Sequence, residues 1–225
     1  MILRPRRARV DAYTVLYAPF IGPNASITFK DMSANNYAMT AQGSAKLSTA
    51  YSKFMLSSLA LDGVDDWVSV GAIGNWNFLH NSTAKFTFEM QYKANNFIAN
   101  APLFGTSTGS SAYVGTHCAL NADRTISLAI VFGTSAQYAV SFTSVGTFPN
   151  DTTAFHHIEV DCDMSLANGN VNVYVDGVRL VGTGNKSGSY SNANSQTTLA
   201  IGDYGGGTNP VTNAYITDVR ISNII

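Results

Sequence analysis

The sequence predicts an all-β protein built as a two-sheet antiparallel sandwich, and three observations predict it. Period-two alternation of apolar and polar residues dominates the chain, and helical periodicity is nearly absent. Stretches rich in Gly, Asn and Ser separate the alternating segments, as turns do between antiparallel strands. Charged residues make up only 12% of the 225 residues, well below the roughly 25% of an average soluble domain. A chain of this length and composition is typical of a single all-β domain.

The clearest strand covers residues 85–93, where large apolar side chains alternate with polar ones. Alternate residues of a strand share a face, so one face of this segment is apolar and the other is polar. The segment 158–163 alternates in the same way and supplies a second apolar face. The core contacts expected between the two join Phe86, Phe88 and Met90 to Ile158 and Val160.

Other segments fix turns and an interior strand. The run Ser127–Phe132 is apolar on both faces, which predicts a strand in the middle of the sandwich. The dipeptide Asp176–Gly177 between two short apolar runs predicts a two-residue hairpin. Cys118 and Cys162 lie in strand-like stretches, where we expect them to be reduced and buried as small apolar residues.

The charge distribution excludes several classes of partner. The net charge is -1, so no overall field attracts nucleic acid, and no apolar run approaches the length of a membrane span. The first residues carry no secretory signal, and we expect the chain to begin at Met1. Residues 1–12 form a basic N-terminal arm, which we expect to contact an acidic neighbouring protein. The arginines of this arm are Arg4, Arg6, Arg7 and Arg9.

Five segments, in order, carry a family resemblance: Leu59–Val70, Lys85–Tyr92, Phe155–Val160, Asn172–Val178, and the closing pair Leu199–Asp203 and Ala214–Ser222. They resemble the strands of concanavalin A-like, laminin-G-like domains. The resemblance implies that residues 13–225 form a concanavalin A-like jelly roll. It implies adhesion or carbohydrate binding in many members and no catalysis, although the fold also hosts hydrolases.

The front of the chain, Asp11–Phe20, Phe29–Ser33 and Thr49–Phe54, resembles laminin-G-like proteins of tailed bacteriophages. This resemblance leads to the hypothesis of a bacteriophage virion structural protein, a capsid decoration or cement protein. Its expected location is the virion, on the capsid surface or a fibre, in an oligomeric or lattice-bound state. The expected partners are the major capsid protein and a host-surface glycan. The alternative is a carbohydrate-binding adhesin module of a tail or head fibre, and a glycoside hydrolase is a third, less favoured reading.

The acidic residues Glu159, Asp161 and Asp163 share one strand face and resemble the acidic strand of laminarinase-type glucanases. Glycosidases that retain configuration need two carboxyl groups ~5 Å apart, whereas residues four apart on a strand are ~13 Å apart. We therefore interpret these carboxylates as a solvated face and expect a protein that is not an enzyme. The four histidines, at positions 80, 117, 156 and 157, are expected to make structural hydrogen bonds.

A calcium ion is the one cofactor that the family resemblance implies. Asp31 and Asp218 occupy places where relatives carry ligands, with Asn35 as a further oxygen donor. Two other carboxylates of the pattern are missing, because Pro19–Gly22 and Ile216–Thr217 replace them. The residues therefore favour a site without calcium, and the ion remains an alternative.

Aromatic residues in Asn- and Gly-rich loops are candidates for contact with a glycan or a protein partner. They are Trp76, Tyr190 and Tyr204. For Trp76 the competing interpretation, which we favour, is that its ring packs beneath its own loop.

Overall fold

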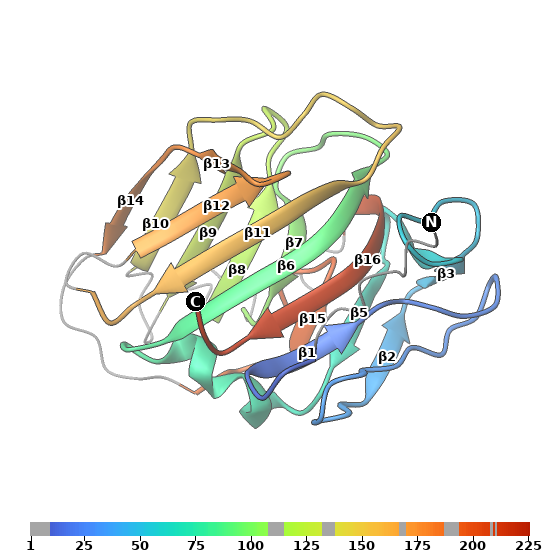
Figure 1. The fold of residues 1–225 in the computed structure, drawn as a ribbon, viewed down its shortest axis with the longest axis horizontal. Helices are drawn as coiled ribbons and strands as arrows, with labels where there is room; N and C mark the ends of the chain where they lie inside the picture. The colour runs from blue at the N-terminus through green and yellow to red at the C-terminus, as the bar shows by residue number, and fades with distance from the viewer. Residues whose placement is uncertain are drawn as a thin grey trace, which may run out of the picture.

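The computed structural model describes residues 10–107, 115–131, 138–166, 170–186, 194–207, 209 and 211–225. Two antiparallel sheets of eight strands each pack face to face, so the predicted sandwich is confirmed. Figure 1 looks onto the first sheet, with the second sheet behind it. The arginines of the N-terminal arm lie outside the described residues.

The first sheet runs in the order β13 (Val178–Leu180), β12 (Asn170–Val175), β11 (His156–Asp163), β6 (Lys85–Ala94), β16 (Asn213–Ser222), β4 (Ser58–Asp62) and β3 (Lys46–Ser48), with β1 (Thr14–Ala18) also paired to β16. The second runs in the order β14 (Gly182–Lys186), β10 (Tyr138–Ser144), β9 (Ile126–Val131), β8 (Gly115–Leu120), β7 (Ala101–Gly105), β15 (Leu199–Ile201), β5 (Trp67–Val70) and β2 (Met39–Gln42). Some neighbouring strands, such as β6 and β16, are far apart in sequence, so the chain crosses between the two sheets before it returns.

The predicted core lies between the two sheets. In the β6–β11 register Phe88 is opposite Val160 and Met90 is opposite Ile158. These four side chains and Phe86 are completely buried, which confirms the expected contacts. Phe88 also stacks on Phe104 of β7, with ring centroids 3.8 Å apart, so this pair joins the two sheets directly.

The interior strand and the hairpin also agree with the sequence patterns. Strand β9 lies between β8 and β10 and is buried along most of its length. Asp176 and Gly177 join β12 to β13 with φ angles of 52° and 77°, as a tight hairpin turn requires. Both cysteines are buried, and neither belongs to a disulfide.

One segment differs from the prediction: residues Ile73–His80 form a 3₁₀ helix, η1, where the sequence suggested an open loop. Trp76 is completely buried in this helix, its indole N–H donates to the carbonyl of Val70, and its ring packs edge-on against Tyr37. Trp76 therefore anchors η1 to the core. This burial agrees with the favoured interpretation, a ring packed beneath its own loop. The alternative, a ligand contact, does not fit, because no part of the ring reaches the surface.

Strand β16 changes neighbour along its length. Its first residues pair with β4 and its last residues pair with β1, while β6 runs along the other side. A register shift between Thr217 and Arg220 marks the change, and Asp218 lies in it with a φ of 52°. Aspartate tolerates this left-handed conformation better than most residues, which explains its presence at this bulge.

A buried polar contact holds η1 against the second sheet. The His80 ring Nε2 lies 2.8 Å from the hydroxyl of Thr106, which also accepts the backbone N–H of Thr116. The hydroxyl of Thr116 donates to the carbonyl of Leu79. Burial lowers the pKa of His80 to about 4, so this histidine is neutral in the folded protein near neutral pH.

The core predicts a strong asymmetry between adjacent residues of β6. Replacing Phe88 by Ala should lower the free energy of unfolding by ~3 to 5 kcal/mol, because the lost ring leaves a cavity between the sheets. Thr87→Ala should cost about 1 kcal/mol, more than expected for an uncovered residue, because its hydroxyl lies 2.7 Å from Asp161 and 3.0 Å from the carbonyl of Ile224. Chemical denaturation of both variants measures this difference, and equal losses would contradict one-sided burial.

The buried His80 predicts a specific loss of stability in acid. Its folded-state pKa of about 4 lies below the unfolded value of 6.5, so the unfolded chain binds the proton first as the pH falls. The neutral ring's contribution is complete above pH 6.5 and declines by about 3 kcal/mol on going down to pH 4. Between pH 6.5 and pH 4 the free energy of unfolding, measured by denaturation at each pH, should fall more steeply for the wild type than for His80→Gln. If the free energy of unfolding falls equally with pH in both proteins, His80 does not titrate in this way.

Candidate functional site

The outer face of the first sheet, which points away from the core, carries a continuous polar strip. Alternate residues of β6 and β11 face outward, and each lies opposite a polar partner on the adjacent strand. The opposed pairs of this strip are Gln91 with His157, Glu89 with Glu159, Thr87 with Asp161, and Lys85 with Asp163. The solvated face expected for the carboxylates of β11 is therefore present, but it includes partners from β6.

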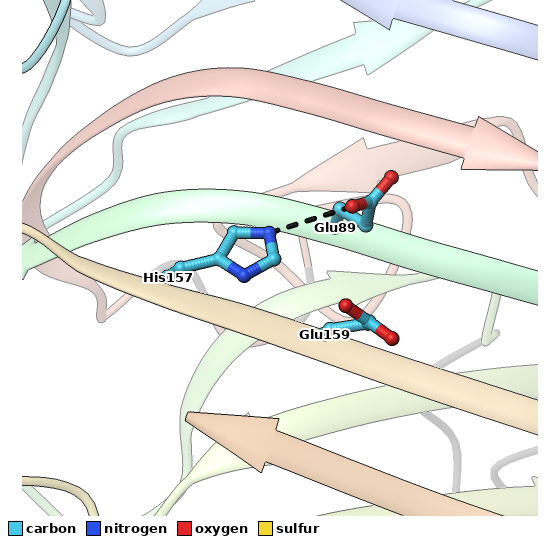
Figure 2. Close-up of side chains that lie close together, drawn as sticks. All are labelled: Glu89, His157 and Glu159. Carbon is cyan, nitrogen blue, oxygen red and sulfur yellow. Dashed lines mark ion pairs between the residues drawn. The ribbon is translucent and has the colours of Figure 1, made fainter. Parts of the chain in front are cut away.

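The centre of this strip is a compact cluster of Glu89, His157 and Glu159, shown in Figure 2. The His157 Nε2 atom lies 3.5 Å from a carboxylate oxygen of Glu89, and ligand atoms from all three residues lie within 4.8 Å of one another. Arg220 of β16 approaches the second oxygen of Glu89 at 3.7 Å. All three cluster residues are partly buried.

The cluster separates the proton affinities of its two carboxyl groups. Hydrogen bonding to His157, aided by Arg220, lowers the pKa of Glu89. Partial burial raises the pKa of Glu159, and the negative charges of Asp161 and Glu89 add to this effect. The same contact with Glu89 raises the pKa of His157. The arrangement thus favours a protonated or otherwise cation-balanced state.

Asp163 does not take part in this cluster. Its carboxylate forms a 3.0 Å ion pair with Lys85 and accepts the backbone N–H of Ser165. These contacts are at the far end of the strip and leave Glu159 and Asp161 without the third member of the glucanase-like pattern.

A second site is an open pocket of about 320 Å³ at the edge where β3, β4 and β16 meet. Its lining combines amides, carboxylates, a lysine and an aromatic ring. The lining residues are Ser44, Lys46, Ala60, Leu61, Asp62, Asp66, Asn95, Asn213 and Tyr215. Strand pairing brings them together, because Tyr215 lies opposite Ala60 and Asn213 lies opposite Asp62.

The polar groups of the pocket are held by hydrogen bonds. The Asn95 amide donates to the side-chain oxygen of Asn213 at 2.7 Å, and Lys93 donates to the side-chain oxygen of Asn95 at 3.0 Å. Asp66, which is buried, accepts the backbone N–H groups of Ser44 and Asp62. Asp62 is exposed at the rim, so its carboxylate is open to a ligand.

The aromatic residue in the pocket lining is Tyr215, and Tyr51 packs beside it. The rings of Tyr215 and Tyr51 are 4.7 Å apart, and the Lys93 ammonium lies 4.1 Å from the centre of the Tyr51 ring. Burial lowers the pKa of Lys93, and the two rings hold its charge by cation–π contact. Tyr51 remains 44% exposed, so an aromatic face is accessible beside the polar groups.

The sequence patterns missed this pocket. Asp62 and Asp66 belong to a segment noted only for its family resemblance, and Tyr215 belongs to the closing strand. Of the aromatic candidates, Tyr204 is only 9% exposed and packs against His117, and Tyr190 lies outside the described residues. The signal that was available is the outward phase of Asn213 and Tyr215 in β16.

The residues proposed for calcium do not fit the ion. Asp31 is buried, and its two oxygens accept four hydrogen bonds, from the backbone N–H groups of Tyr17, Ser33 and Tyr37 and from the Ser33 hydroxyl. A carboxylate has about four lone-pair positions, so none is left for a metal. The amide of Asn35 donates to the carbonyl of Val15.

Asp218 is engaged elsewhere in the bulge. Its carboxylate accepts the Tyr17 hydroxyl at 3.0 Å, and burial raises its pKa, which disfavours the charged form that a calcium ion requires. Both groups of three or more close metal-ligating side chains among the described residues lie elsewhere: one is the cluster above and the other is Asp62, Asp65 and Asp66.

These contacts predict that Asp31 stabilises the fold without calcium. Asp31→Asn places an amide N–H₂ against backbone donors, so the free energy of unfolding should fall by ~2 to 3 kcal/mol. The loss should be equal with added calcium chloride and with EDTA, whereas Asn35→Ala, at an exposed position, should cost under ~1 kcal/mol. A wild-type melting temperature that rises with calcium, without a rise in Asp31→Asn, would restore the calcium interpretation.

Solved structures with a similar fold include binding domains of toxins. The binding domain of Paraclostridial Mosquitocidal Protein 1 aligns with a TM-score of 0.68 and 12% identity. A botulinum neurotoxin type C structure aligns with a TM-score of 0.66 and 17% identity, and the cell entry of that toxin is described as dependent upon interaction with two ganglioside molecules. The binding domain of botulinum neurotoxin DC in complex with SialylT aligns with a TM-score of 0.62 and 14% identity.

These alignments cover 96% of this chain but only 49–50% of the toxin chains, so this chain spans about half their length. At such low identity the likeness concerns the fold alone. No curated protein sequence matches the chain. Among the described residues, no helix has the length and apolar character needed to cross a bilayer.

A family model matches most of the chain. It covers residues 62–224, from the end of β4 to the last strand, and includes four of the five segments noted in the sequence in full. The chain belongs to the laminin-G-like family of the concanavalin A-like lectin/glucanases superfamily.

Proposed function

We propose that this chain is a carbohydrate-binding module whose glycan contact is the pocket beside Tyr215. The observation that carries the proposal is the combination of a tyrosine face with an amide pair and an exposed carboxylate in one pocket. Sugars present an apolar face to an aromatic ring and hydroxyl groups to polar side chains, so this combination matches their chemistry.

The dimensions and the chemistry of the pocket suit one or two sugar rings. A volume of about 320 Å³ is at the small end of ligand pockets. A sugar hydroxyl both donates and accepts, and the pocket offers an acceptor in Asp62, a donor in Lys46 and amides that do both. Fold relatives associated with gangliosides and SialylT support the proposal without defining the sugar.

We propose binding without hydrolysis. The pocket is at one end of the first sheet, near the start of β16, whereas the paired carboxylates Glu89 and Glu159 lie further along β6 and β11. Lys93 is four positions along β6 from Glu89, which corresponds to about 13 Å. A sugar bound beside Tyr215 is therefore not positioned between Glu89 and Glu159. Of the two carboxylates in the pocket itself, Asp66 is buried and held by the backbone N–H groups of Ser44 and Asp62.

Binding to a glycan array, followed by calorimetry with the best ligand, tests this proposal. Tyr215→Ala and Asp62→Asn should each weaken binding about tenfold or more, a loss of about 1.4 kcal/mol, by removing the ring face and a hydroxyl acceptor. Tyr13→Ala is the matched control, because Tyr13 is 52% exposed and belongs to no part of the pocket. An array without any bound glycan, or equal affinity in all variants, would overturn the proposal.

A second candidate is attachment to a virion as a decoration protein, as the phage-like front of the sequence suggests. The supporting observation is a set of exposed apolar side chains on the loop between β3 and β4 and on the segment that follows β1. Phe54 and Leu56 are 61% and 82% exposed, and Ile21 lies nearby, since Gly22 donates to the Ser57 hydroxyl. Exposed apolar side chains of this size are typical of protein contacts.

Quantitative mass spectrometry of purified virions distinguishes the two roles. A decoration protein should be present in a fixed ratio to the major capsid protein, and Leu56→Ser with Phe54→Ser should reduce that ratio without changing glycan affinity. If the protein is absent from the capsid and still binds glycan, the decoration role is excluded and only the adhesin role remains.

A further inference from the structure

The outer strip of the first sheet carries more negative charge than its cations balance. Glu89 and Glu159 lie directly opposite each other, and like charges in this position destabilise a sheet. Asp161 adds a third carboxylate one step along β11. The cations nearby are His157 and Arg220, and Arg220 also pairs with Asp11 at 3.1 Å. The arrangement is poised to accept a further positive charge.

The donor atoms already have spacings close to those of a coordination shell. Ligand atoms at ~2.1 Å from a tetrahedral zinc ion are about 3.4 Å apart. The His157 Nε2 atom is 3.5 Å from the Glu89 oxygen, and the Glu159 oxygen lies within 4.8 Å of both. Figure 2 shows the Glu159 carboxylate on the same side of the two strands as the other two groups. Small rotations of the glutamate side chains close the remaining gap.

An independent observation comes from Gln91, which neighbours the cluster on the same face of β6. Its side chain is 8% exposed, and its Oε1 atom is buried without a hydrogen-bond partner. Gln91 lies opposite His157 in the strand register. A buried acceptor without a donor is costly unless a ligand satisfies it. Gln91 therefore offers a buried, unsatisfied amide oxygen on a residue that lies next to the cluster in the sheet.

We infer that Glu89, His157 and Glu159 form a binding site for a divalent transition-metal ion of the zinc class, with Gln91 as an adjoining oxygen donor. One imidazole nitrogen with carboxylate oxygens is a donor set suited to zinc and unlike the all-oxygen set of calcium. Arg220 orients Glu89 from its second oxygen, as an outer-shell partner does. This site is separate from the pocket beside Tyr215 and does not depend on the proposed glycan.

The strands make this site more rigid than a loop cluster. Both glutamates and the histidine project from paired central strands whose inner faces are fixed in the core. The Glu89 and His157 side chains are 26% and 29% exposed, so an ion can enter from solvent. Water or a ligand oxygen would complete its coordination on the open side.

Isothermal calorimetry with zinc chloride on EDTA-treated, dialysed protein tests the inference. The wild type should bind one equivalent, and zinc should raise its melting temperature. Glu159→Gln and His157→Asn should each reduce the affinity by ~100-fold or more, since even outer-shell changes cost 10- to 100-fold. Glu159→Gln removes a like-charge contact with Glu89, so the variant should fold at least as well as the wild type.

Two matched controls separate this site from other ligands. Asp62→Asn with Asp65→Asn removes the second acidic group, and His156→Gln removes the adjacent histidine, which pairs with Asp176 instead. Both controls should bind zinc with wild-type affinity. The inference is overturned if the wild type binds no zinc, if Glu159→Gln binds as tightly as the wild type, or if either control abolishes binding.

Discussion

The register between β6 and β11 is the constraint on which the rest of this structure depends. Because side chains alternate along a strand, the register that places Phe88 against Val160 inside the sandwich also places Glu89 against Glu159 outside it. A shift by one residue would expose the stack between Phe88 and Phe104 and bury the glutamates. The apolar core therefore fixes the outer cluster, although no attraction between the two carboxylates exists to hold them together.

Strand β16 extends this constraint to the rest of the first sheet. Its bulge at Asp218 turns the strand so that one end pairs with β4 and the other with β1. The first end contributes Asn213 and Tyr215 to the pocket, and the second contributes Arg220 to the cluster. The two ends of β16, on either side of the bulge, thus contribute residues to two different surface sites. The hydrogen bond from Tyr17 to Asp218 fixes the bulge from the neighbouring strand β1.

Local patterns predicted what depends on one strand at a time. The alternation in β6 and β11 identified both faces, and Asp176–Gly177 identified a hairpin, because each signal lies within a few residues. The pocket could not be predicted in this way, since Asp62 and Asn213 are 151 residues apart and meet only through the pairing of β4 with β16. Glu89 was likewise overlooked as a partner of Glu159, because opposition across strands is not visible in either segment alone.

Trp76 and Asp31 are both buried, and for a common physical reason. Both residue types suit a ligand when exposed, but each can also satisfy the interior of its own chain. The Trp76 indole donates to the carbonyl of Val70. The Asp31 carboxylate accepts the backbone N–H of Tyr17 in β1 and those of Ser33 and Tyr37 in the irregular segment before β2. Backbone groups without a strand partner must be satisfied somewhere, and a buried aspartate does this efficiently.

In the outer strip, by contrast, some buried polar atoms have no hydrogen-bond partner among the described residues. Gln91, Arg220 and Ser222 each keep a buried polar atom without a hydrogen-bond partner, and all three lie on β6 or β16 around Glu89. Such atoms lower stability, and a face selected only for stability would replace them or pair them. The core beneath them is closely packed and supplies the stability that this arrangement requires. Polar groups without partners on interior strands of a sheet are what a preorganised binding site requires, because a ligand then completes contacts that the free protein lacks.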